Sequence, residues 1–151
     1  MSDYMSGRAL RALQLGLRVD RAAATHIAAT TPYFNVIGGR VLVTGLVGSV
    51  TVAAGANACS WVANPTTGTA TQVICAQLDI NPALVGDSLT ITGIVADAMT
   101  YGAAGGLPMF EVRGIICLVG TIDFIAAAAD GDTSWVIFYV PIDDGAYITA
   151  A

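Results

Sequence analysis

Runs of apolar residues in a strand-like pattern recur along most of the chain after residue 30. Residues 87–95 alternate cleanly, with Leu89 and Ile91 on one face and Ser88 and Thr90 on the other. Other runs are rich in β-branched and aromatic residues and are bounded by glycine, proline or aspartate. This pattern predicts an all-β fold built from many short strands.

Glycine-containing turns separate two pairs of these runs. Gly38 and Gly39 join residues 33–37 to residues 40–47, and the Asp-Gly-Asp sequence at 130–132 joins residues 121–126 to residues 134–140. Glycine supplies the positive φ that a tight turn between antiparallel strands needs. We therefore predict a β-hairpin at each of the two turns, and an antiparallel β-sandwich or barrel as the fold.

The run at residues 134–140, SWVIFYV, is apolar on both of its alternating faces. A strand of this kind has to be buried on both sides. A second sheet of the same domain can cover one side, and we expect another subunit to cover the other. The residues predicted for this subunit interface are Trp135, Ile137, Phe138 and Tyr139.

The N-terminal segment has a different pattern, which is that of a short amphipathic helix or an ordered arm. Leucines recur at helical spacing between residues 6 and 17, with arginines between them. We divide the chain into an arm, residues 1–21, and a single β domain, residues 22–151. The arm residues expected to bind a partner are Arg8, Leu10, Arg11, Leu13, Leu17, Arg18 and Arg21.

Composition strengthens the expectation of an assembly. Apolar residues make up 55% of the chain and charged residues only 11%, whereas globular domains average roughly 45–50% and about 25%. Monomers keep large contiguous apolar patches off their surfaces, and obligate oligomers bury them against neighbours. We therefore expect a homo-oligomer.

Charge is divided unevenly along the chain. Residues 1–21 hold four arginines against two aspartates, a balance of +2, and residues 22–151 hold two arginines against nine acidic residues, a balance of −7. Nucleic-acid binding is disfavoured because the whole chain has a pI near 4.4 and residues 22–151 are strongly acidic. The basic arm could pair with an acidic protein surface, or it could be an ordinary solvated helix face.

The sequence contains no recognisable catalytic or cofactor motif, so we expect no enzyme and no cofactor. His26 is the single histidine, and a structural role is the default for it. Three cysteines without paired spacing indicate buried, reduced thiols at Cys59, Cys75 and Cys117, and no zinc site. The aspartates at 130, 132, 143 and 144 lie beside glycine, which favours turn formation over calcium binding.

Neither a membrane span nor a secretory leader is expected. The uncharged stretch at residues 41–78 is interrupted throughout by glycine, serine, threonine, asparagine and proline, whereas a bilayer helix needs about 20 mainly apolar residues. The first ten residues lack the apolar core of a signal peptide.

The C-terminal third, residues 120–151, resembles the ending of small virion proteins of tailed bacteriophages. The similar features, in order, are a Gly-Thr-Ile strand at 120–122, a strand carrying Trp135, Ile137 and Tyr139, and a closing segment from Pro141 to Ala146. Residues 34–51 also resemble the first hairpin of such proteins. Together these segments cover about one third of the chain, and residues 54–107 have no counterpart.

The resemblance implies a capsid decoration protein, a non-enzymatic trimer that clamps neighbouring subunits of the capsid shell. Its location would be the virion, assembled in the host cytoplasm, and its partners would be the shell protein and further copies of itself. Two alternatives stay open. One is a glycan- or ligand-binding module that uses the loop at 100–108, with Tyr101, and exposed aromatic residues. The other is a different phage subunit, of the tail tube or head-completion type.

Overall fold

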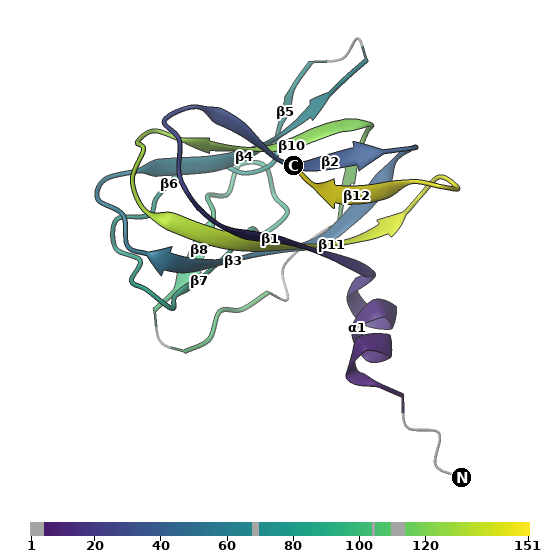
Figure 1. Cartoon of the computed structure of the whole chain (residues 1–151), viewed down its shortest axis with the longest axis horizontal. Helices are drawn as coiled ribbons and strands as arrows, with labels where there is room; N and C mark the ends of the chain where they lie inside the picture. Colours follow the sequence, from purple (N-terminus) through teal and green to yellow (C-terminus); the bar gives the residue numbers. More distant parts are fainter. Residues whose placement is uncertain (1–4, 68–69, 104, 110–113) are drawn as a thin grey trace.

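The chain forms a two-layered antiparallel β-sandwich with one short helix at its N-terminus (Figure 1). The structure is a computed structural model, and it describes residues 5–67, 70–103, 105–109 and 114–151. Over these residues the two sheets pack face to face and do not close into a barrel. The predicted all-β class is confirmed, and of the two predicted architectures the sandwich is the one found.

The first sheet has the order β1-β11-β3-β7-β8, and β9 pairs with residues 41–43 of β3 on the side that faces away from β11. Its strands are antiparallel, and the longest contact is between β11 and β3. The elements are α1 (Gly7–Leu15), β1 (Leu17–Thr25), β11 (Asp132–Pro141), β3 (Val41–Val52), β7 (Ser88–Thr90), β8 (Thr100–Gly102) and β9 (Ile115–Cys117).

The second sheet has the order β12-β2-β10-β4-β5, with β6 paired to β4. In Figure 1 its main strands lie above those of the first sheet. The elements are β12 (Tyr147–Ala150), β2 (Thr30–Ile37), β10 (Gly120–Ala126), β4 (Ala58–Pro65), β5 (Gln72–Val73) and β6 (Leu78–Asp79).

Both predicted hairpins are wrong. β2 pairs with β10 and β12, whereas β3 lies in the other sheet; likewise β10 pairs with β2 and β4, whereas β11 pairs with β1 and β3. The turns at Gly38 and at Gly131 therefore carry the chain from one sheet to the other. A Cβ at Gly38 would come within 2.5 Å of the Gly145 carbonyl oxygen, and one at Gly131 within 2.6 Å of the Ala54 side chain. Glycine is needed there for close packing between loops.

The long strands alternate between the two sheets along the chain, and this gives the connectivity of a jelly roll. The first sheet contains the order β1-β11-β3-β7, and the second contains the order β2-β10-β4-β5. β2, β3 and β4 each lie in the opposite sheet from the strand before them, and later in the chain β10 enters between β2 and β4 and β11 enters between β1 and β3. Jelly rolls are built in this way from two interlocked Greek keys.

An aromatic cluster fills the space between the sheets. Trp61 on β4 and Trp135 on β11 meet edge to face with ring centroids 4.8 Å apart. Phe124 lies 5.1 Å from Trp61, and Tyr33 stacks on Phe124 at 5.0 Å. All four residues are at most 2% exposed. Edge-to-face and offset contacts of this kind add to the free energy gained by burying the rings.

Candidate interaction surface

Helix α1 forms because its ends are capped locally. Ser6 accepts a hydrogen bond at its Oγ from the Ala9 backbone N–H, 3.2 Å away, as an N-cap residue does. Gly16 ends the helix with a φ of 87°, and its N–H donates to the Ala12 carbonyl oxygen at 3.1 Å. The helix predicted for residues 6–17 is thus confirmed, with bounds at Gly7 and Leu15.

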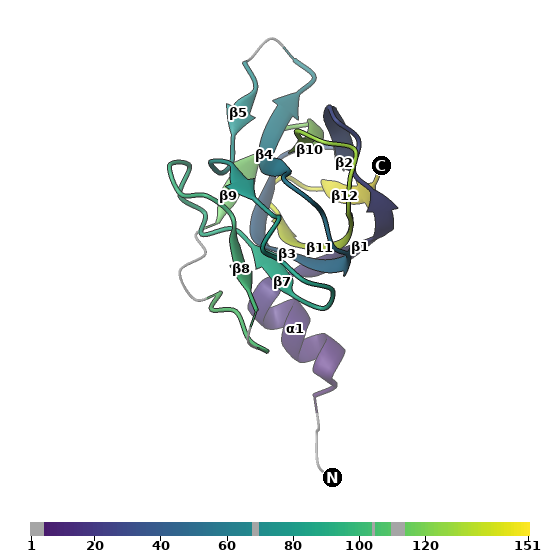
Figure 2. The ribbon, with the colours of Figure 1, turned by 90° about the vertical axis from the view of Figure 1, so that its left-hand side faces the viewer.

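Helix α1 is attached to the sandwich at a narrow junction. A Cβ on Gly16 would lie 2.2 Å from the Tyr139 carbonyl oxygen, so only glycine lets the chain pass this close to β11. On the other side, the hydroxyl of Thr44 donates a hydrogen bond to the carbonyl oxygen of Leu15. From this junction α1 projects away from both sheets, as two perpendicular views show (Figures 1 and 2).

The apolar side chains of α1 stay in solvent. No residue of the helix is buried, and the exposed fractions are 54% for Leu10, 74% for Leu13 and 49% for Leu17 at the start of β1. A nine-residue helix is marginal in water and normally depends on packing of its apolar face. No described residue of this chain buries these leucines, so the sequence prediction that they contact a partner keeps its physical basis.

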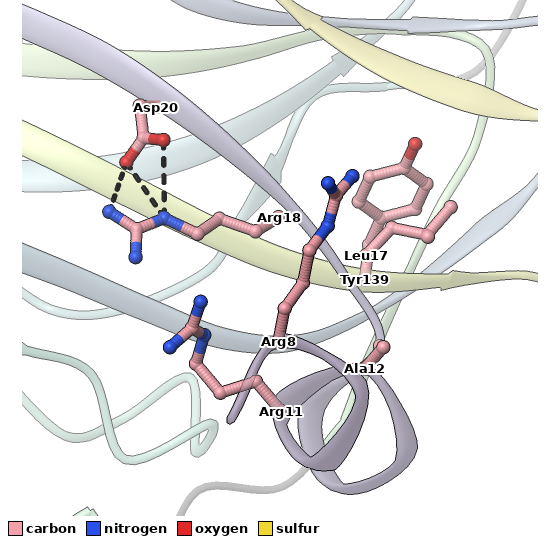
Figure 3. A pocket seen from close by; sticks show the side chains of 8 residues that line it. Arg8, Arg11, Ala12, Leu17, Arg18, Asp20 and Tyr139 are labelled. Atoms are coloured by element: carbon pink, nitrogen blue, oxygen red, sulfur yellow. Dashed lines mark hydrogen bonds and ion pairs between the residues drawn. The ribbon is translucent and has the colours of Figure 1, made fainter. Parts of the chain in front are cut away.

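A pocket of about 550 Å³ lies between α1 and β1 (Figure 3). Arg8 and Arg11 extend from the helix toward the strand that carries Arg18 and Asp20, and Tyr139 supplies part of the apolar wall. The remaining lining residues are Ala12, Gly16 and Leu17. The pocket thus combines guanidinium groups with an apolar wall.

The four arginines of the predicted arm do not form one group. Arg18 donates to Asp20 through Nε at 2.9 Å and through a terminal nitrogen at 2.6 Å, so its charge is already paired. Arg21 lies over the Tyr33 ring, 3.5 Å from its centroid, and belongs to the body of the domain. Arg8 and Arg11 have no hydrogen bond, ion pair or ring contact with any residue that the structure describes.

The predicted boundary at residue 21 falls inside a strand. β1 runs from Leu17 to Thr25 and pairs with β11 from Leu17–Tyr139 to Thr25–Asp132. All of residues 17–25 therefore belong to the sheet. The segment that stands apart from the sandwich ends at Gly16.

The predicted subunit interface on β11 is wrong. Trp135, Ile137 and Tyr139 are at most 4% exposed and belong to the core between the sheets. Phe138 faces the other way but is only 7% exposed. A Cβ at Gly45 would be 3.1 Å from the Met109 side chain and 3.3 Å from the Phe138 ring, which places Met109 of this chain beside Phe138. Three of the four side chains thus belong to the core of this chain and Phe138 is nearly covered, whereas Val140 on the same strand is 42% exposed.

His26 is a buried structural residue. Its Nδ1 lies 3.0 Å from the Asp130 carbonyl oxygen, which can only accept, so Nδ1 carries the proton. Nε2 then accepts from the Thr133 hydroxyl at 2.9 Å, and Thr133 Oγ1 in turn accepts from the Trp135 indole N–H at 2.8 Å. Burial lowers the pKa of His26, so the ring is neutral. Its two nitrogens each form a hydrogen bond that joins the end of β1 to the start of β11.

The cysteine side chains and the aspartates of the turns also have structural roles. Cys59, Cys75 and Cys117 are buried free thiols, as predicted, and burial raises their pKa values to about 12, 11 and 12. Asp130 accepts from the Gly55 N–H at 2.6 Å, and Asp143 accepts from the backbone and the guanidinium of Arg40. Within the described ranges, no three His, Cys, Asp or Glu side chains gather as metal ligands would.

Most of the described aromatic rings that could stack on a sugar are buried. Trp61 and Trp135 lie in the core with Tyr33, Phe138 and Tyr139, each at most 7% exposed. Tyr101 is half-buried, pairs with Leu89 across β7 and β8, and packs against the core. These rings do not form the exposed platform that a glycan-binding module needs.

Sequence reasoning missed Gly16 and Asp20 as parts of this surface, and it expected Tyr139 in a subunit interface on β11 without placing it beside the helix. Gly16 had a usable signal, because glycine directly after a leucine-periodic segment is a common helix end. Tyr139 had none, since it is brought to the helix only by the pairing of Leu17 with Tyr139 across the first sheet.

Comparison with known proteins adds no relative: no protein-family model, no curated protein and no solved structure matches the chain. In the part of the chain that the structure describes, no helix has the length and apolar character to cross a membrane.

Proposed function

We propose that this chain is a non-enzymatic structural subunit of a virion, a capsid decoration protein that assembles with copies of itself as a trimer and clamps neighbouring subunits of the capsid shell. Its place would be the virion, put together in the host cytoplasm. The observation that carries the proposal is the exposed apolar side of α1, held out from the sandwich by a rigid junction.

The junction fixes the direction in which α1 leaves the sandwich. Gly16 lies against β11 and Thr44 on β3 bonds the end of the helix, so the helix is attached at one place, unlike a disordered tail. The helix then presents Leu10 and Leu13 at a constant position relative to the body. An element of this kind is suited to clamp an adjacent protein.

Further apolar side chains lie exposed in the loops and at strand edges. Ile116 on β9 is 62% exposed, and Leu84 and Val85 before β7 are each 64% exposed. Ile116 and Leu118 line a second, smaller groove of about 160 Å³ together with Pro65. Apolar surface at several separate places supports a protein that is surrounded by neighbours.

The jelly-roll connectivity is compatible with the proposal but does not carry it. Capsid domains use this connectivity, and so do lectins and cupins. The resemblance of residues 120–151 to phage virion proteins and the lack of a metal cluster or an unsatisfied histidine in the described residues favour the structural role.

The direct test is co-expression of the chain with the major shell protein of the same genome, followed by purification of the particles and cryo-electron microscopy. We expect ordered density for the chain on the outside of the shell, repeated at symmetry-related sites. Particles that form without the chain while it stays in the supernatant would overturn the proposal.

A truncation separates the clamp from the fold. The deletion should remove residues 1–15, because a deletion to residue 21 would also remove part of β1 and its pairs with β11. We expect the truncated chain to fold, as judged by circular dichroism and urea unfolding, and to lose its place on the particles. Full-length chain purified in parallel is the control, and undiminished incorporation of the truncated chain would show that α1 is not the clamp.

A further inference from the structure

The charges that the chain leaves unpaired point to one specific contact between copies. Among the described arginines, Arg18, Arg21 and Arg40 are engaged by Asp20, the Tyr33 ring and Asp143. Arg8 and Arg11 are not, and both reach into the pocket beside α1. The carboxylate that lines this pocket, Asp20, is already paired with Arg18. Two guanidinium groups without a partner of their own therefore favour a carboxylate from outside the chain.

The carboxylates can be sorted in the same way. In the described ranges most aspartate side chains accept hydrogen bonds from this chain, for example Asp79 from the Asn57 N–H and Asp87 from the Leu84 N–H. Asp132 and Asp144 are the two described aspartates whose side chains have no hydrogen bond or ion pair, and Asp144 is the exposed one. It lies in the turn between β11 and β12.

This turn is built as a rigid, protruding feature. Arg40 holds Asp143 with two side-chain hydrogen bonds of 2.9 and 2.7 Å and a backbone hydrogen bond of 2.7 Å. The Ile142 N–H also donates to the Arg40 carbonyl oxygen at 3.0 Å. Asp144 is thereby presented next to Ile142, which is 42% exposed.

We propose that the pocket between α1 and β1 receives the β11–β12 turn of a second copy of this chain, with Asp144 of one copy paired to Arg8 and Arg11 of the next. Ile142 would then lie against the apolar wall that Leu17 and Tyr139 supply. The pocket and the turn are complementary. The pocket offers two cations and an apolar wall, and the turn offers a carboxylate and an exposed apolar side chain. The inference rests on the self-assembly within the proposed function, and it names the surfaces.

The position of the two surfaces determines the kind of assembly. α1 leaves the sandwich at Tyr139, and the turn begins two residues later, after Pro141, so both lie at the same end of the molecule (Figure 1). The contact joins two different surfaces and is therefore heterologous. Repeated around an axis, a heterologous contact produces a closed ring, as a trimer requires.

Charge exchange on the full-length chain tests the contact. One variant carries Arg8→Glu with Arg11→Glu, a second carries Asp144→Arg, and a third combines all three substitutions. Asn81→Arg is the control, because Asn81 is exposed and lies outside both surfaces. Sedimentation velocity at a fixed protein concentration and low salt measures the assembly, and circular dichroism checks the fold.

We expect each of the first two variants to weaken self-association at least tenfold, and the combined variant to recover it, because the charges again match in every contact of the ring. The control should assemble like the wild type. Assembly unaffected by the first two variants, or a combined variant no better than its parents, overturns the inference.

Two outcomes separate this inference from the proposed function. If the charge variants self-associate normally but bind shells poorly, the occupant of the pocket is the shell protein, and the inference is wrong while the proposed function stands. If the wild-type chain is a monomer at every concentration tested, self-assembly fails and both are wrong.

Discussion

The two core tryptophans provide a matched test of how this core is held together. Trp61 and Trp135 are 0% and 1% exposed and face each other edge to face. Their indole N–H groups differ: that of Trp135 donates to Thr133 at 2.8 Å, whereas that of Trp61 finds no acceptor among the described residues. Replacing each tryptophan by phenylalanine therefore removes a similar part of the ring. In Trp135 it also removes a favourable hydrogen bond, whereas in Trp61 it removes an unfavourable buried donor.

The expected magnitudes follow from these contacts. Loss of buried ring atoms and the small cavity that results should cost about 2 kcal/mol in either variant. Trp135→Phe also loses a hydrogen bond, which adds about 1 kcal/mol, whereas Trp61→Phe removes a buried unpaired donor and recovers roughly 1–3 kcal/mol. We expect Trp135→Phe to be less stable than Trp61→Phe by about 2 kcal/mol or more.

Urea unfolding of both variants, followed by circular dichroism at one protein concentration, measures this difference. Equal m-values are required for the comparison, because a changed m-value would indicate a changed unfolded or native state. For a chain of this size the difference corresponds to roughly 4–8 °C in Tm. The reasoning fails if Trp61→Phe costs as much as Trp135→Phe.

Three other predictions concern pH and the helix junction. Burial lowers the pKa of His26, so on acidification the unfolded chain takes up a proton that the folded chain does not. The free energy of unfolding should therefore fall as pH drops below about 6.5, and His26→Gln should remove this dependence in a series of urea titrations. Arg40 lowers the pKa of Asp143 from 3.8 to about 2, so stability should fall again between these values, and Asp143→Asn should weaken that second phase. Gly16→Ala places a side chain against the Tyr139 carbonyl at positive φ, so it should lower the free energy of unfolding by at least about 1–2 kcal/mol and weaken self-association. Gly7→Ala, which has open space around it, is the control and should change neither quantity. Equal thermal melting and equal sedimentation of the two variants would contradict the role of Gly16 at the junction.

Local patterns were sufficient for the class of fold and for several elements. Leucine spacing predicted α1, and the alternation in residues 87–95 grouped Leu89 with Ile91, which are both at most 1% exposed. Thr90, on the opposite face of this alternation, is buried as well, and its hydroxyl donates to the Leu46 carbonyl.

Strand pairing could not be predicted from the turns. A tight turn and a crossing between sheets both reverse the chain, and both favour glycine. What decides between them is distant: β2 has its partners more than 80 residues away, in β10 and β12. For the same reason the pocket beside α1 was not predicted, since Tyr139 reaches it through the pairing of β1 with β11.

The corrected pairing changes where an assembly contact is needed. The apolar strand β11 was the original reason to expect a subunit interface, yet the sandwich covers Trp135 and Ile137 on one side and Met109 lies beside Phe138 on the other. Excess apolar surface lies instead on α1, in loops and at strand edges, outside the paired β1–β11–β3 centre. The sandwich therefore has a complete core of its own, and contacts between copies can form or break at α1 without unfolding it. This separation is why removal of residues 1–15 should abolish assembly and leave the urea midpoint of the β domain almost unchanged.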